Sequence, residues 1–123
     1  MENIKLLSAK ELAKITQHRS GEIKFGEKVQ VIPQDVNTFN FIKDSSAQFV
    51  LLGIPEDIGV RANKGRSGTS SAFESTLKSL VNIQHNKFCK GSNLIILGEI
   101  DVQKEMILAQ NLDAKIKEDR KQL

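Results

Sequence analysis

A glycine-punctuated, basic stretch between residues 59 and 69 holds the side chains best suited to chemistry. Its three cations, Arg61, Lys64 and Arg66, precede a predicted helix whose first N–H groups lack intrahelical partners. Cationic side chains and helical N–H groups that meet in one crevice can bind an anion. The residue types equally fit a plain turn in which the glycines permit sharp bends and the cations are solvated. Both interpretations stay open at this point.

Two common phosphate-binding motifs are excluded by spacing. A Walker-type loop needs two glycines separated by four residues and followed by Lys and Ser or Thr. Here five residues separate Gly59 from Gly65, and Arg66 stands where that lysine would be. No Gly-x-Gly-x-x-Gly occurs, so the dinucleotide fingerprint is absent as well.

Two apolar runs predict the strands that position this loop. Residues 49–54 are apolar except for the small Gly53, which is typical of a parallel strand buried on both faces. Residues 94–97 form a second such run. Between them a helix is expected to start near Ser70 or Ser71, with Ser71 and Glu74 as a capping box. Its core-facing stripe consists of Phe73, Leu77, Leu80 and Val81.

The flanking segments predict fewer elements. Ser8 and Glu11 form a capping box, so a short helix is expected near residues 8–17. Val29 and Val31 before Pro33 indicate a brief extended piece. Residues 34–48 read as mostly irregular, with Phe39 and Phe41 either on one face of a short strand or clipped against the core. From residue 102 onward one helix is expected, with its apolar positions at Leu108, Leu112 and Ile116.

The composition limits the class of protein. With 123 residues, 39% hydrophobic and 27% charged, the chain is one soluble domain or part of one. The net charge of +3 is small and no dense basic face is visible, so we expect no nucleic-acid partner. No apolar run reaches the roughly 20 residues that span a bilayer, and no signal peptide is recognisable, which predicts a cytoplasmic protein without a membrane partner. The single Cys89 is expected to be an unreactive thiol.

The predicted architecture is α/β, and it is incomplete. Strand, helix and strand over residues 49–101 make a βαβ unit, preceded by a lead-in helix and irregular segment over 1–48 and followed by a helix over 102–123. Two strands that are apolar throughout require neighbouring strands and helices on both faces. Because the chain offers few helices to cover them, we expect it to be the amino-terminal portion of a longer protein.

The glycine-punctuated segment resembles the first strand and loop of the ureohydrolases, the family of arginases, agmatinases and formimidoylglutamases. Residues 97–101 are similar to the family's second strand and the short acidic turn after it. The branch with the greatest similarity is that of the formimidoylglutamases, although Ser67 replaces the proline that relatives often have there. The residues that carry the resemblance are Gly53, Ile54, Pro55, Asp57, Gly59, Val60, Asn63, Gly65, Arg66 and Gly68.

The resemblance implies a three-layer α/β/α arginase-like fold with a mainly parallel sheet, a pair of Mn²⁺ ions in the full-length parent, and a homo-oligomer. The ions would activate a hydroxide that attacks an amidine or guanidine carbon. The family's three metal motifs, Gly-Gly-x-His, Asp-Ala-His-x-Asp and Asp-x-Asp, are missing, and His18 and His85 are expected to be solvated or structural. We therefore expect no metal and no catalytic residue in this chain. The implied substrate-binding residues are Arg61, Asn63 and Arg66.

Two functional hypotheses follow from the sequence. In the first, the chain is the amino-terminal fragment of a Mn²⁺-dependent ureohydrolase, formimidoylglutamase-like in its substrate and inactive by itself. In the second, the chain is a non-catalytic binding or assembly module that keeps the family's first βαβ unit. The metal motifs, if they follow in a longer reading frame, would decide for the first.

Overall fold

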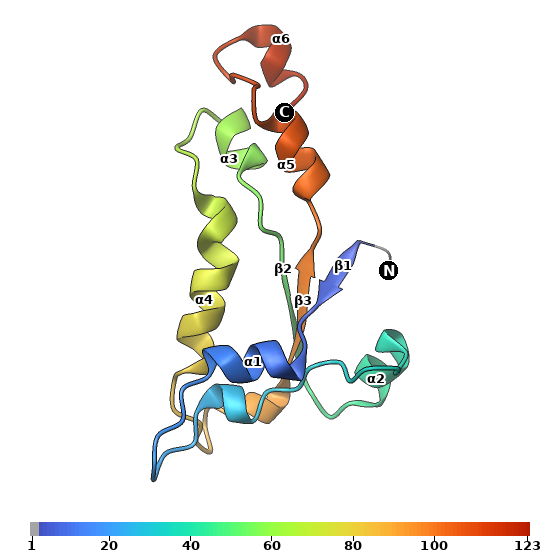
Figure 1. Ribbon diagram of the computed structural model, residues 1–123, viewed down its shortest axis with the longest axis vertical. Coiled ribbons are helices and arrows are strands. Elements are labelled where there is room, and N and C mark those ends of the chain that lie inside the picture. The colour runs from blue at the N-terminus through green and yellow to red at the C-terminus, as the bar shows by residue number, and fades with distance from the viewer. Residues whose placement is uncertain (1–2) are drawn as a thin grey trace.

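Three strands form a small mixed sheet at the centre of the computed structural model, which describes residues 3–123 (Figure 1). Strand β3 (Leu94–Ile100) lies in the middle, with β2 (Phe49–Gly53) parallel to it and β1 (Ile4–Leu6) antiparallel on its other side. The α/β class is thereby confirmed. The helices are α1 (Ala9–Ile15), α2 (Thr38–Asp44), α3 (Ile58–Ala62), α4 (Ala72–Val81), α5 (Gln103–Ala109) and α6 (Lys117–Arg120), with single 3₁₀ turns at Phe25–Glu27, Thr69–Ser71 and Gly91–Asn93.

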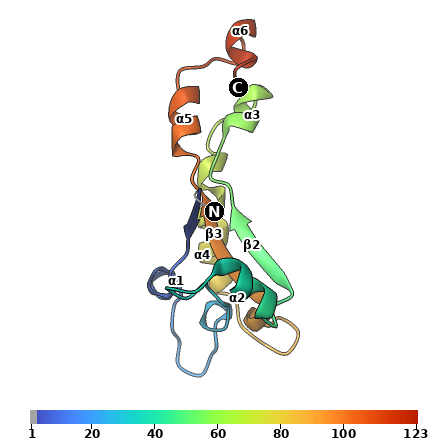
Figure 2. The same ribbon diagram turned by 90° about the vertical axis from the view of Figure 1, so that its right-hand side faces the viewer.

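The core lies on both faces of β3. On one face, Ile96 packs with Leu12 of α1 and with Leu77 and Val81 of α4. On the opposite face, Ile95 and Leu97 pack with Ile32 and with partly buried side chains of α2. Figure 2 shows α2 in front of β3 and α4 behind it. Alternate residues of a strand point to opposite faces, so β3 supplies the centre of both clusters. The sheet is thus covered by α1 and α4 on one side and by α2 on the other.

Helix α1 begins as the sequence predicts. The hydroxyl of Ser8 accepts a hydrogen bond from the backbone N–H of Glu11 (3.1 Å), and the carboxylate of Glu11 accepts one from the backbone N–H of Ser8 (2.9 Å). These two bonds satisfy N–H groups that have no partner within the helix. The expected extended piece before Pro33 is also present, where Gln30 bridges Ile95 in parallel.

The strand at residues 49–54 is confirmed, but the prediction that it is buried on both faces is wrong for the described chain. Strand β2 is an edge strand of the sheet and pairs only with β3 within residues 3–123. Phe49 stays 64% exposed, Val50 45% and Ile54 58%. An apolar strand at a sheet edge is unusual because it can pair with another chain.

The segments before β2 and after β3 differ in part from what the sequence predicts. Residues 34–48 are irregular at both ends, but they contain the helix α2, which was not expected; Asn37 caps it by accepting from the backbone N–H of Asn40 (3.0 Å). Phe39 and Phe41 therefore lie on a helix and not on a strand. Phe39 is exposed, whereas Phe41 packs against the core cluster around Ile95, as the second of the two expected placements has it. The single helix expected from residue 102 onward is broken into α5 and α6.

The capping box expected at α4 is absent, although the helix starts at Ala72, close to the predicted position. The hydroxyl of Ser71 donates to the carbonyl oxygen of Gly68 (3.0 Å), and Glu74 pairs instead with Lys78 (2.6 Å). The 3₁₀ turn at Thr69–Ser71 puts Ser71 in a helical conformation, with ψ near −2°, whereas a capping residue is normally extended.

Candidate functional site

The glycine-punctuated loop leaves the carboxyl end of β2 and returns to α4, and α3 occupies its middle (Figure 1). Its ends are tied together by polar contacts. The buried carboxylate of Asp57 accepts from the backbone N–H of Gly68 (3.1 Å), and the hydroxyl of Thr69 donates to the carbonyl oxygen of Glu56 (3.1 Å). Asp57 thus orders the loop through a backbone N–H group.

Arg61 is anchored to the protein's own backbone. Its Nη2 donates to the carbonyl oxygens of Ala109 (2.6 Å) and Leu112 (2.8 Å), at the end of α5. The carbonyl oxygen of Ala109 also accepts from the backbone N–H of Leu112 (3.1 Å), so Arg61 reinforces the turn that ends α5. A cation there also compensates the negative end of the helix. One edge of the Arg61 guanidinium is therefore already bonded within the protein, and the substrate-binding role implied for Arg61 stays a prediction.

Asn63 and Arg66 differ in how they are held. The amide of Asn63 donates to the carbonyl oxygen of Gly59 (3.1 Å), and its backbone closes the last turn of α3. Lys64 follows with a φ of 61°, a backbone conformation that residues other than Gly, Asn and Asp rarely adopt. Arg66 is exposed, and no hydrogen bond or ion pair joins it to another residue in the range 3–123.

Arg61 lines two hollows. The first, of about 450 Å³, is lined by Asp57, Arg61, Ser67, Gln103, Met106, Ile107 and Gln110. The second, of about 250 Å³, will be called the basic hollow; it is lined by Arg61, Lys64, Gly65, Ser67, Leu112, Asp113, Ala114 and Lys115. Sequence reasoning had no signal for Gln103, Gln110 or Lys115, because only the fold brings α5 and the segment after it against the loop.

A third hollow, of about 350 Å³, lies at the carboxyl ends of the strands. It is bordered by Lys5 of β1, Pro55 after β2, and Glu99 and Asp101 at the end of β3. In open α/β sheets, ligands bind beyond the carboxyl ends of the strands. The predicted location for a ligand is therefore lined partly by acidic side chains, whereas the cations gather beyond it around α3.

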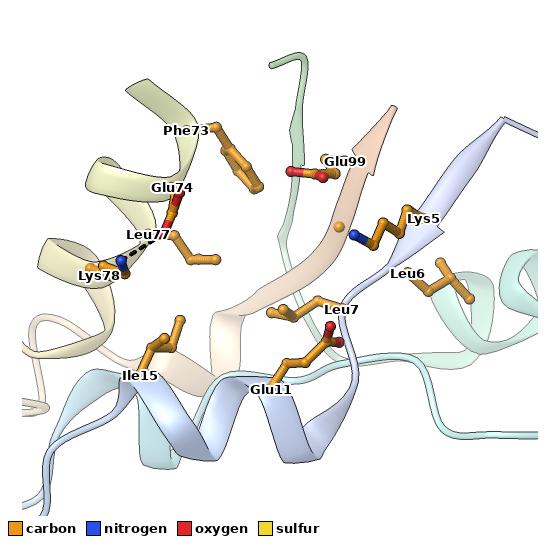
Figure 3. A pocket seen from close by; sticks show the side chains of 11 residues that line it. Lys5, Leu6, Leu7, Glu11, Ile15, Phe73, Glu74, Leu77, Lys78 and Glu99 are labelled. Carbon is orange, nitrogen blue, oxygen red and sulfur yellow. Dashed lines mark hydrogen bonds and ion pairs between the residues drawn. The ribbon is translucent and has the colours of Figure 1, made fainter. Parts of the chain in front are cut away.

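A groove of about 350 Å³ separates α1 from α4 and reaches the sheet (Figure 3). Its floor is apolar, from Leu7, Ile15, Phe73 and Leu77, and its rim is charged. On that rim the ammonium group of Lys78 holds the pKa of the Glu74 carboxyl below its ordinary value. Ser8, through its backbone N–H and its hydroxyl, does the same to the pKa of Glu11.

The described residues do not fit a pair of Mn²⁺ ions. Within residues 3–123, no group of three or more His, Cys, Asp and Glu side chains is arranged to hold a metal. Nδ1 of His18 is 2.9 Å from a carboxylate oxygen of Glu27, and Nδ1 of His85 accepts from the backbone N–H of Gly91 (3.1 Å). Both rings take part in local structure, as the sequence predicts for them.

Comparisons with protein-family models, with curated proteins and with solved structures found no match to this chain. In the part of the chain that the structure describes, no helix is long and apolar enough to cross a membrane.

Proposed function

We propose that this chain is the amino-terminal portion of a ureohydrolase, an enzyme that hydrolyses the C–N bond of a linear amidine or guanidine, with a formimidoylglutamase-like substrate. One observation supports the proposal above others. The residues of the family-like motif form a loop at the carboxyl end of β2, and a bond from the backbone N–H of Gly68 to Asp57 closes it. Strand β2 is parallel to its neighbour β3, and the chain crosses from one to the other by way of helix α4. Such a loop is where an α/β enzyme binds its substrate.

The proposal assigns no metal to residues 3–123, since none of their side chains are grouped to hold one. In the parent, a Mn²⁺ pair would supply an activated hydroxide, and its ligands would come from residues outside this chain. Further strands of a three-layer α/β/α sheet would cover the exposed apolar side chains of β2. In that enzyme, residues of this chain would position the substrate, and the groups that hydrolyse it would come from the rest of the parent protein.

Within the loop, Arg66 is the residue proposed to bind the carboxylate of the substrate. It is exposed and carries the fork of N–H donors that pairs with a carboxylate. Asn63 orients the loop through its bond to Gly59, and Arg61 holds the loop against α5 and offers its remaining N–H groups to the same ligand.

The experiment starts from the complete gene product that contains these residues. We expect Mn²⁺-dependent release of formamide from formimidoylglutamate, or of urea from arginine or agmatine. Arg66→Lys should raise KM roughly tenfold or more and leave the Mn²⁺ content unchanged, since a lysine cannot form the paired bonds and the residue is remote from the metal. Lys87→Arg, in the exposed loop before β3, is the control and should keep the parental KM.

The proposal would be refuted if the complete gene product turned over none of these substrates in the presence of Mn²⁺. Activity with unchanged KM in Arg66→Lys would refute the role of Arg66 alone. Calorimetric titration of residues 1–123 with Mn²⁺ provides a further check, because a stoichiometric site of sub-micromolar Kd would contradict the assignment of all ligands to other parts of the parent.

The alternative, a non-catalytic assembly module, is favoured by one specific observation. Strand β2 presents a free edge with exposed Phe49, Val50 and Leu52 and has no charged residue along its length. Such an edge can add a strand from another chain. Sedimentation of the chain tests this: an oligomer that Val50→Lys dissociates, while Leu108→Lys on the exposed side of α5 does not, would support assembly through β2.

A further inference from the structure

We propose that the basic hollow is a binding site for a compact oxyanion, either phosphate or the carboxylate end of a small molecule. The proposal does not depend on the hydrolase assignment. It rests on the convergence of two segments far apart in sequence, residues 61–67 and 112–115, around a space of about 250 Å³. That space is large enough for one such group.

The charges that line the hollow are predominantly positive. Arg61 and Lys64 come from the loop after β2, and Lys115 comes from the segment between α5 and α6. Ser67 adds a hydroxyl that can donate to an oxyanion. Three cations brought together in a concave site repel one another unless an anion lies between them, so the arrangement favours an anionic ligand.

The one acidic side chain of the lining, Asp113, is occupied by the backbone. Its Oδ1 accepts from the N–H of Lys115 (2.9 Å), and its own N–H donates to Asp119 (3.0 Å). Asp113 therefore fixes the turn that presents Lys115. A carboxylate that accepts backbone N–H bonds is also partly compensated, so it opposes an incoming anion less than a bare one would.

Arg61 is held in place before any ligand arrives. Its Nη2 is bonded to the carbonyl oxygens of Ala109 and Leu112, so binding need not immobilise a flexible guanidinium. The same bonds fasten the segment with Lys115 to the loop with Lys64, because Leu112 lines the hollow too. The site is thus shaped by interactions that exist without the ligand.

The test is a titration of the ¹⁵N-labelled chain with inorganic phosphate and, separately, with succinate, at pH 7 and low salt. We expect saturable shifts of the amide signals of residues 64–67 and 113–115, and a weaker Kd as NaCl is added. The two ligands distinguish a phosphate site from a carboxylate site by their relative Kd. Each variant is titrated in the same way.

Lys64→Gly is the sharpest variant because glycine tolerates the φ of 61° better than lysine does, so the loss of the cation comes without loss of the fold. We expect Lys64→Gly and Lys115→Gln each to weaken Kd about three- to fivefold, and the double variant about tenfold or more. Lys117→Gln removes one charge two residues from Lys115, outside the lining of the hollow, and should change Kd less than twofold.

The proposal would be overturned by amide shifts that do not saturate. It would also be overturned if the amides next to lysines elsewhere in the chain shifted as much as those that line the basic hollow. A Kd that all three single variants change to the same degree would overturn it too, because only the net charge would then matter. None of these measurements involves Mn²⁺ or turnover, so a negative result leaves the proposed hydrolase untouched, and an inactive parent protein leaves the anion site untouched.

Discussion

The Nη2 atom of Arg61 lies 2.6 Å from the carbonyl oxygen of Ala109, which joins the loop after β2 to the end of α5. A second bond to Leu112 and a bond from the Nε of Arg120 to the carbonyl oxygen of Ala62 (3.2 Å) strengthen the same junction. The apolar side chains of Ile107 and Leu108 on α5 are exposed and add little packing at this junction. Arg61 is thus the main polar link between these two parts of the molecule.

Replacing Arg61 by methionine should therefore destabilise the protein by about 1.5–3 kcal/mol, the range for hydrogen bonds to a charged group. The amides of residues 109–116 should exchange with solvent faster, because that segment loses its anchor. Denaturant unfolding and hydrogen exchange measure the two effects. Arg66→Met is the matched control; an equal loss of stability in both variants would show that the bonds of Arg61 contribute nothing special.

Gly98 is expected to tolerate no side chain. Its φ is +136°, and a Cβ there would overlap the carbonyl oxygen of Lys5 and lie 2.8 Å from the backbone nitrogen of Leu7. Gly98→Ala should cost about 2–4 kcal/mol and weaken the pairing of β1 with β3. Gly59→Ala on α3, where the new Cβ would meet only the side chain of Glu56, should be neutral or stabilise by up to about 1 kcal/mol. The reverse order in thermal unfolding would contradict the local geometry.

The crossover helix α4 should depend more on Leu77 than on Phe73. Leu77 is buried in the cluster around Ile96, whereas Phe73 packs across Gly53 of β2 and stays partly exposed beside the groove of Figure 3. Leu77→Ala should cost about 2–5 kcal/mol. Phe73→Ala should cost less, about 1–2 kcal/mol, because part of the ring is already in contact with water. Equal losses in urea unfolding would mean that Phe73 is as much a core residue as Leu77.

The start of α1 should make stability depend on pH in the acid range. Bonds from the backbone N–H and the hydroxyl of Ser8 lower the pKa of Glu11 from 4.5. A lowered folded-state pKa contributes stability above the unfolded pKa, and this is lost as the pH falls through the folded value. Ser8→Ala keeps the backbone N–H, the larger of the two causes, and removes the hydroxyl. In NMR titration of the side-chain carboxyl it should therefore raise the pKa of Glu11 part of the way to its ordinary value and leave that of Glu74, paired with Lys78, unchanged. A Glu11 pKa unaffected by Ser8→Ala would contradict the bond from the hydroxyl of Ser8 to that carboxylate.

How far a local pattern predicts structure is seen in the two expected capping boxes. Ser8 with Glu11 forms one, but Ser71 with Glu74 does not, although the residue types and spacing are the same. At α4, the turn that follows Gly68 puts Ser71 in a helical conformation, and Lys78 offers Glu74 another partner. A capping motif in the sequence thus predicts a helix start more reliably than it predicts the bonds made there.

The sequence by itself determined the two parallel strands, the crossover helix between them and the place of the loop, because these depend on apolar runs and short-range spacing. Only the tertiary structure decided that Arg61 is bonded to the end of α5, that Lys115 reaches the basic hollow, and that β2 is left at the sheet edge. These depend on contacts between residues some 50 positions apart in the chain. No local pattern in the loop specifies them, since the approach of the segment that ends α5 to the loop sets which groups meet.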